Sequence, residues 1–196
     1  MELDAIVFGG RRASNVPLVT QATSWRHGVF MGATMSSEQT AAAEGTVGAV
    51  RRDPFAMLPF TGYNMADYWS HWLGFEKRAG VKLPQIFRVN WFLKNSRGEF
   101  IWPGFGENAR VLRWITERIE GATEAVSTPI GLLPELSDLL DETLGLDSEH
   151  KQALLAWEAD LTRGDLEDIG DYFAKFEAHL PIELETELKE RLAMLE

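Results

Sequence analysis

The chain has 196 residues, 45% of them hydrophobic and 25% charged, which is enough to bury a core as one large or two small domains. It has no cysteine, which excludes disulfides, thiolate metal sites and a cysteine nucleophile. The net charge of −11 is unevenly spread: residues 1–120 hold 14 Lys and Arg against 11 Asp and Glu, and residues 121–196 hold 5 against 19. We therefore expect any anion site in the first part and a solvated helical surface in the tail.

No apolar run approaches the roughly 20 residues that span a bilayer, and the start "MELDAIVFGG" lacks a basic stretch followed by an apolar one. These features predict a cytoplasmic protein with no membrane partner.

The first elements in chain order are predicted to be short buried strands. "LDAIVFGG" reads as a strand that ends at Gly9 and Gly10, and "HGVFMGATM", residues 27–35, reads as another, with "PLVTQATSW" between them. "MADYWSHWLGFEKRAG", residues 65–80, has the spacing of an amphipathic helix.

A β-hairpin followed by a helix is predicted next. "LPQIFRVNWFL" and "EFIWP" are β-rich runs on either side of the turn-forming "KNSRG", and "ENARVLRWITERI" has a helical apolar face. Beyond Gly121 the pattern predicts three or four helices, roughly 134–144, 148–162, 165–179 and 181–195. The fold class is therefore mixed α/β (α+β): a strand-rich part over residues 1–121, then an acidic helical tail over 122–196 packed on the same domain.

The junction between hairpin and helix has the residue types of a nucleotide-base site. Gly104 and Gly106 permit tight turns, and free N–H groups at a helix start favour an electron-rich ligand. A flat base gains about 1–3 kcal/mol per stacked ring, and an amide can read its edge. The candidate contacts are Phe92, Phe100, Phe105 and Asn108. The alternative is that these rings form the core of the hairpin.

Two further segments suit an anionic ligand. "FGGRR", residues 8–12, places Arg11 and Arg12 directly after a strand, where guanidinium forks can meet phosphate oxygens. "QTAAAEGTVGAVRRDPF", residues 39–55, is rich in small residues and suits a lid that closes over a ligand. The alternatives are surface arginines and a plain surface loop.

These motifs, taken together and in order, resemble a known family. "DAIVFGGRR", "AAAEGTVGAVRRDPFAMLPF", "LPQIFRVNWF" and "WPGFGENARVL" are similar to the C-terminal part of GTP-dependent phosphoenolpyruvate carboxykinase. The similarity is dense from about residue 4 to 120 and continues more weakly in the tail. It implies an enzyme that converts oxaloacetate and GTP to phosphoenolpyruvate, GDP and carbon dioxide, with Mn²⁺ or Mg²⁺, in gluconeogenesis.

The resemblance also assigns roles to residues. It implies that Arg11 meets the nucleotide phosphates near the transferred group, and that a mobile lid closes over the substrates. The implied guanine and nucleotide contacts are Phe92, Phe100, Phe105, Gly106, Glu107 and Asn108, and the implied lid residues are Ala41, Ala42, Ala43, Glu44 and Gly45.

Parts that the reaction needs are not found in this sequence. Phosphoryl transfer needs a phosphate cradle and a positioned metal, yet the chain has no G-x-x-x-x-G-K-[ST] motif and no Gly-Lys pair. The four histidines show no ligand spacing, so no metal site is assigned. The resemblance implies that the missing groups lie upstream, in enzymes about three times as long, and we expect this chain alone to be inactive. It also implies missing strands beside "LDAIVFG", and an exposed sheet edge through which the chain self-associates.

Two other classes of function fit the composition less well. A single-stranded nucleic-acid binder combines aromatic rings with arginines, but it needs a strongly basic groove, and residues 1–120 carry only +3. A non-catalytic interaction module built on the tail helices would show no response to nucleotide.

Overall fold

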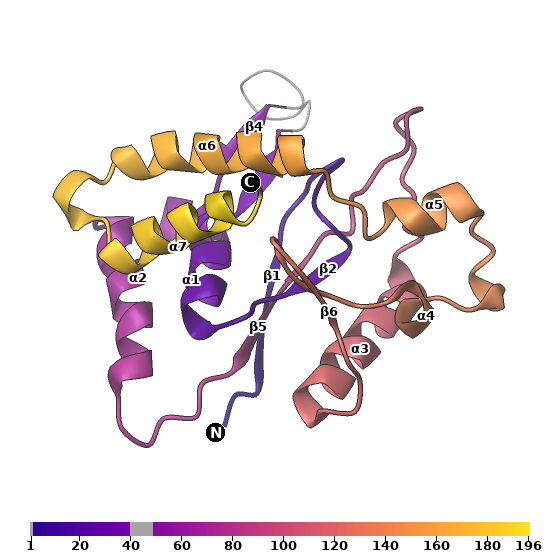
Figure 1. The fold of residues 1–196 in the computed structure, drawn as a ribbon, viewed down its shortest axis with the longest axis horizontal. Helices are drawn as coiled ribbons and strands as arrows, with labels where there is room; N and C mark the ends of the chain where they lie inside the picture. Colours follow the sequence, from indigo (N-terminus) through magenta and orange to yellow (C-terminus); the bar gives the residue numbers. More distant parts are fainter. Residues whose placement is uncertain (1, 40–48) are drawn as a thin grey trace.

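The computed structural model describes residues 2–39 and 49–196, and they form a mixed α/β fold around a twisted five-stranded sheet (Figure 1). The strand order is β1-β5-β2-β7-β6. β1 and β5 are parallel, and the other neighbours are antiparallel. The strands are β1 (Ala5–Gly9), β5 (Gln85–Val89), β2 (Val19–Gln21), β7 (Gly131–Leu133) and β6 (Val126–Thr128).

A second, two-stranded sheet stands beside the end of β1. It pairs β3 (Ser36–Glu38) with β4 (Val50–Arg52) in antiparallel register, with Ser36 opposite Arg52. These strands flank residues 40–48. The predicted lid residues Ala41 to Gly45 therefore lie outside the described residues.

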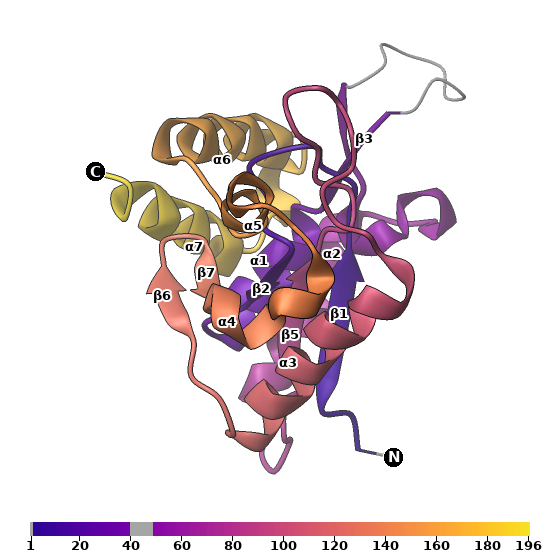
Figure 2. The same ribbon diagram turned by 90° about the vertical axis from the view of Figure 1, so that its right-hand side faces the viewer.

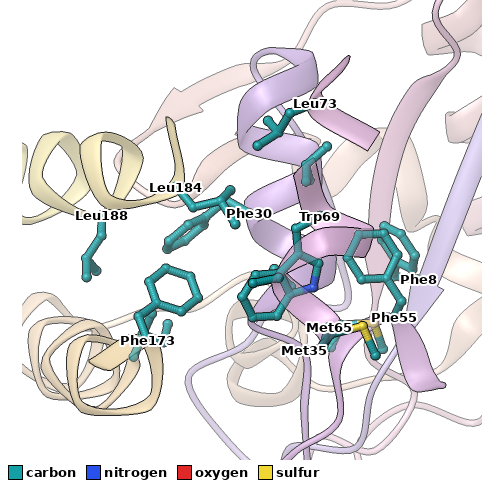
Figure 3. Close-up of a cluster of buried hydrophobic side chains, with 14 of the residues drawn as sticks. Phe8, Phe30, Met35, Phe55, Met65, Trp69, Leu73, Phe173, Leu184 and Leu188 are labelled. Carbon is teal, nitrogen blue, oxygen red and sulfur yellow. The ribbon is translucent and has the colours of Figure 1, made fainter. Parts of the chain in front are cut away.

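One face of the sheet is covered by four helices: α1 (Trp25–Ala33), α2 (Met65–Leu73), α6 (Ala159–Ala174) and α7 (Ile182–Ala193). Their apolar side chains form a single cluster (Figure 3). Trp69 of α2 is fully buried in this cluster, between helices α1 and α2 on one side and α6 and α7 on the other. Phe173 of α6 and Leu184 of α7 pack against Phe30 of α1 in this cluster. The acidic tail thus contributes part of the core.

The opposite face is covered by α3 (Asn108–Glu120), α4 (Leu136–Leu139) and α5 (Ser148–Ala153), which lie in front of the sheet in Figure 2. Trp114 of α3 is fully buried edge-on against Phe87 of β5, with 6.0 Å between ring centroids. β5 therefore gives Ile86 to one core and Phe87 to the other, as the alternation of a strand requires.

The prediction of a strand at residues 27–35 is wrong, because this segment lies in helix α1 and the turn that follows it. The hydroxyl of Ser24 caps the helix by accepting a hydrogen bond from the backbone N–H of His27. A Cβ on Gly28 would stand 2.4 Å from Cδ1 of Ile86, so glycine lets the helix lie directly on β5. The helix is buried on nearly all sides, which removes the polar face that distinguishes a helix from a strand in sequence.

The predicted hairpin after residue 83 is reduced to one isolated bridge between Lys94 and Phe100. β5 instead pairs with β1 and β2. The expectation that the strands beside "LDAIVFG" are missing is therefore wrong for the edge of β1 that pairs with β5. The other edge of β1 is the end of the sheet.

The tail differs in detail from the prediction of helices throughout. β6 and β7 occupy residues that were expected to precede the first tail helix. The helix predicted at 148–162 is divided between α5 and the start of α6, and α6 continues through Gly164 into the helix predicted at 165–179. The helices predicted at 65–80 and 107–119 are confirmed as α2 and α3, although α2 continues beyond Leu73 as a 3₁₀ turn.

Two indole rings join α1 to α2. Trp25 and Trp72 stack with 5.6 Å between centroids and 9° between planes, and Nε1 of Trp25 donates a hydrogen bond of 2.8 Å to the carbonyl of Trp72. Their stacking fixes the relative position of the two helices.

Among the described residues, no helix combines the length and the apolar character that a membrane crossing requires.

Candidate nucleotide site

Asn90 joins the two loops that carry the candidate site residues. It follows β5 directly and is fully buried. Its Oδ1 accepts hydrogen bonds from the backbone N–H groups of Arg12 (3.2 Å) and Phe92 (3.3 Å), and its Nδ2 donates to the carbonyls of Arg12 (2.9 Å) and Val16 (2.8 Å). The sequence analysis missed Asn90; the only signal was an amide directly after an apolar strand.

The adjacent arginines have different environments. Arg11 is exposed, and only its backbone is tied down: its N–H donates to Oγ of Ser37 (3.1 Å), and its carbonyl accepts from the N–H of Glu38 (2.8 Å). No hydrogen bond or ion pair of the Arg11 guanidinium is found within residues 2–39 and 49–196. Arg12 turns inward and contacts Ser36 and Asp165. Arg11 alone therefore presents its fork to solvent.

Asp165 of α6 connects the arginine loop to the two-stranded sheet. Its Oδ1 lies 3.3 Å from Nη1 of Arg12 and 2.9 Å from Nη2 of Arg52. Burial by itself raises the pKa of Asp165, but the positive charges of Arg52 and Arg12 outweigh it and hold this pKa below its usual value. The sequence analysis assigned no role to Asp165, because a lone Asp in an acidic helix gives no sign of a partner over 100 residues away in sequence.

The three candidate phenylalanines are placed differently. Phe92 and Phe100 meet edge to face, with 6.0 Å between centroids, and Nζ of Lys94 lies 5.0 Å from the centroid of Phe100. Phe100 is 60% exposed and Phe105 is 94% exposed, so neither ring is hairpin core. Among the described aromatic residues, none forms a ring pair with Phe105.

The loop before α3 holds Phe105 outward. Gly104 has φ of 71° and ψ of −155°, a conformation that disfavours any residue with a Cβ, and Phe105 itself has φ of 49°. A Cβ on Gly106 would meet nothing within 4 Å, so space remains above this backbone. A large apolar ring held in solvent by a strained backbone is typical of a binding contact.

Asn108 begins α3 with half of its amide already in use. Its Oδ1 accepts a hydrogen bond of 2.8 Å from Nε1 of the buried Trp102. This bond fixes which end of the amide faces the indole. The Nδ2 group is therefore the end available to a ligand, and it can only donate.

Glu107 and Arg110 tie the start of α3 to the acidic tail. Nε of Arg110 lies 2.5 Å from Oε2 of Glu107, and its other nitrogens donate to Asp141 (2.8 Å) and Thr143 (2.9 Å). Hydrogen bonds from Arg110 and Thr143 hold the pKa of Asp141 well below its usual value. These contacts hold the loop that carries Phe105 against the acidic tail.

A divalent cation, which the family resemblance implies, finds no ligand set here. Residues 2–39 and 49–196 contain no group of three or more His, Asp or Glu side chains placed to hold a metal ion. We therefore derive no catalytic step through a metal from these residues.

Comparisons with known proteins identify the family. Residues 1–193 match the family model described as phosphoenolpyruvate carboxykinase C-terminal P-loop domain. The chain belongs to the GTP-dependent phosphoenolpyruvate carboxykinase family. It is 53% identical over 199 residues to "Phosphoenolpyruvate carboxykinase [GTP]" of Arthrobacter sp. (strain FB24), covering 98% of this chain and 32% of that protein.

A second bacterial relative gives a similar match. The carboxykinase of Chlamydia pneumoniae is 51% identical over 187 residues, which cover 95% of this chain and 31% of that relative. The chain thus spans about a third of the length of these curated relatives. Although the family model is named for a P-loop domain, the G-x-x-x-x-G-K-[ST] motif does not occur in this sequence.

Proposed function

We propose that this chain supplies the guanine-nucleotide site of a GTP-dependent phosphoenolpyruvate carboxykinase, which converts oxaloacetate and GTP to phosphoenolpyruvate, GDP and carbon dioxide. Two observations together carry the proposal: the rings of Phe100 and Phe105 are both exposed, and they precede a helix whose Asn108 has an N–H₂ group available to a ligand. Family membership favours this function over an interaction module or a single-stranded nucleic-acid binder.

The amide of Asn108 gives a reason for the choice of guanine. Guanine presents the acceptor O6 where adenine presents a donating amino group. Because Oδ1 of Asn108 is held by Trp102, the side chain offers only N–H donors to a base. Such a donor pairs with O6 of guanine and meets a second donor in adenine. Stacking on Phe105 and Phe100 then adds affinity without selecting the base.

Arg11 has the placement of a phosphate contact in the same proposal. Its backbone is held by Ser37 and Glu38, while its guanidinium faces solvent. Asn90 connects the loop of Arg11 to the loop that contains Phe92. A planar fork can contact two phosphoryl oxygens and oppose the charge spread over them during transfer. The residues Ala41 to Gly45 complete the proposal as a lid, on the basis of the resemblance alone.

The rest of the reaction is assigned to the longer protein. We propose that the metal, Mn²⁺ or Mg²⁺, and most of the oxaloacetate site are supplied by residues outside this chain, that the enzyme acts in the cytoplasm in gluconeogenesis, and that this chain alone does not form phosphoenolpyruvate. We also propose that the edge of β1 that has no strand partner within residues 2–39 and 49–196 lets the isolated chain self-associate. A coupled assay for phosphoenolpyruvate tests the inactivity of this chain alone, and a sizing measurement tests its self-association.

The binding proposal is tested by calorimetric titration of GTP and ATP into a full-length carboxykinase carrying this segment. Phe105→Ala is expected to weaken GTP by about 1–3 kcal/mol, the contribution of one stacked ring. Asn108→Ala is expected to narrow the preference for GTP over ATP. The matched control is Phe60→Ala, because Phe60 is also highly exposed, at 84%, but is not a candidate contact. If Phe105→Ala and Asn108→Ala bind both nucleotides as the parent does, the proposed base site is wrong.

A further inference from the structure

Arg88 is half-buried, and its guanidinium has no ion pair or hydrogen bond among residues 2–39 and 49–196. It lies in β5 directly opposite Thr20 of β2, and both residues have a buried polar atom without a hydrogen-bond partner: Nε of Arg88 and Oγ1 of Thr20. No ion pair of Arg88 occurs among the described residues. Burial lowers the pKa of Arg88 to about 10, so the group remains charged at neutral pH. Removing part of a charged group from water without a counter-ion is unfavourable, and Nε is the part of the Arg88 guanidinium that is removed from water.

The neighbouring ion pairs leave positive charge in excess. Arg12 and Arg52 both bind Asp165, whose carboxylate also faces Arg88, so one negative charge serves three guanidinium groups. The other nearby arginine, Arg191, is matched by Glu187 at 2.7 Å. The cluster of Arg12, Arg52, Arg88 and Asp165 therefore has a net charge of about +2, and a mobile anion would lower its energy.

A cavity of about 60 Å³ opens beside Arg88, between β5, α1, α6 and α7. Its polar lining includes His27, Asn15 and Thr162, together with Asp165 and Arg191. One water needs about 10–15 Å³ of such space, so the cavity has room for roughly four to six heavy atoms. This is the size of a tetrahedral oxyanion, and it is too small for a nucleotide.

The lining offers hydrogen-bond donors. Nδ1 of the buried His27 accepts the backbone N–H of Thr23 at 3.1 Å, which leaves the proton of the neutral ring on Nε2. Burial, followed by the charges of Arg191, Arg88 and Arg26, holds the pKa of His27 well below its usual value. Nε2–H has no acceptor among the described residues. The cavity thus combines an unpaired guanidinium with an unused imidazole N–H.

We infer that this cavity binds a small tetrahedral oxyanion of the phosphate or sulfate class, with Arg88 as its counter-charge and His27 as a second donor. The site is separate from the proposed nucleotide contacts, because Arg11 is exposed on the loop after β1 and does not line the cavity. Its occupation completes the charge balance between the sheet and helices α6 and α7. The inference does not depend on nucleotide binding.

The test is nitrogen-detected NMR of the His27 ring in the 196-residue chain, titrated with inorganic phosphate and, separately, with sulfate. Ionic strength is held constant with sodium gluconate, whose anion is too large for the cavity. The His27 signals are expected to shift and saturate. Arg88→Met is expected to weaken this response at least about tenfold, the loss typical of a removed charged hydrogen bond. The control Arg97→Met, at an exposed turn, is expected to leave it unchanged.

Further arms separate this site from the nucleotide site. GTP at the same concentration is expected to leave the His27 signals in place, and Arg11→Lys is expected to leave the phosphate response intact. Without phosphate, Arg88→Met is expected to unfold at the same or a higher urea concentration than the parent, since it removes an unpaired charge. A response that does not saturate, or one equal in Arg88→Met and the parent, would show that the cavity holds only water and would overturn the inference.

Discussion

Gly28→Ala measures how closely helix α1 lies against the sheet. An added Cβ would stand 2.4 Å from Cδ1, 2.7 Å from Cβ and 2.9 Å from Cγ1 of Ile86. A rotamer change can move Cδ1 but not the Cβ of Ile86, so α1 or β5 must shift. Overpacking of this kind costs about 1–3 kcal/mol, and replacing a helical glycine by alanine returns about 1 kcal/mol. We expect a net loss of up to about 2 kcal/mol in the free energy of unfolding.

Gly164→Ala is the matched control. Gly164 lies inside helix α6, and a Cβ there would meet nothing within 4 Å. This variant should gain the helical preference of alanine without the clash, about 0.5–1 kcal/mol. Urea unfolding of both variants, followed by tryptophan fluorescence, gives the two values. Adding Ile86→Val, which removes Cδ1, should recover part of the loss in Gly28→Ala. If Gly28→Ala stabilises the chain as much as Gly164→Ala, the close contact between α1 and β5 is wrong.

Three further changes address the candidate site. Asp165→Asn removes the carboxylate shared by Arg12 and Arg52, and we expect a loss of about 3 kcal/mol at neutral pH. Because the pKa of Asp165 is lower in the folded chain, its carboxylate stabilises the fold above the unfolded pKa of about 4, and this stabilisation is lost as the pH falls through the folded pKa. Urea unfolding at several pH values should therefore show the unfolding free energies of the parent and of Asp165→Asn converging at low pH. Asn90→Ala breaks four hydrogen bonds of a buried amide. The backbone N–H of Arg12 should then exchange faster with solvent in a hydrogen-exchange measurement. An unchanged exchange rate would contradict the role given to Asn90. In a full-length enzyme, Arg11→Lys should lower kcat more than it weakens GTP, because a point charge cannot replace a fork on the transferred phosphoryl group; steady-state kinetics with an unchanged kcat would contradict this.

The elements with a clear polar face were predictable from the sequence. The helix that starts at Asn108 and the helix that starts at Met65 each keep an exposed side, so their apolar spacing shows. Residues 27–35 could not be read in this way, since α1 is buried almost all round, and only Ser24 as a cap hinted at a helix. β6 and β7 have three residues each, too few for a periodic pattern.

The candidate site was predictable in its residue types but not in its supports. The ring residues and Asn108 follow from composition and from the family resemblance, and the exposure of Phe105 is a property of the folded backbone. Asn90, Asp165 and Arg88 have neighbours in the fold that are far away in sequence, so no local pattern marks these three residues. Their roles depend on which strands and helices become neighbours.

The stacked indoles of Trp25 and Trp72 give this protein an internal optical probe. Held 5.6 Å apart in a fixed, asymmetric surrounding, the two indoles contribute to the near-ultraviolet circular dichroism of the native state. The signal depends on the docking of α1 on α2, and it vanishes in a compact state that keeps its helices but loses fixed packing. Each variant above can therefore be checked for native tertiary structure without a label, before any loss of binding is attributed to the residue that was changed.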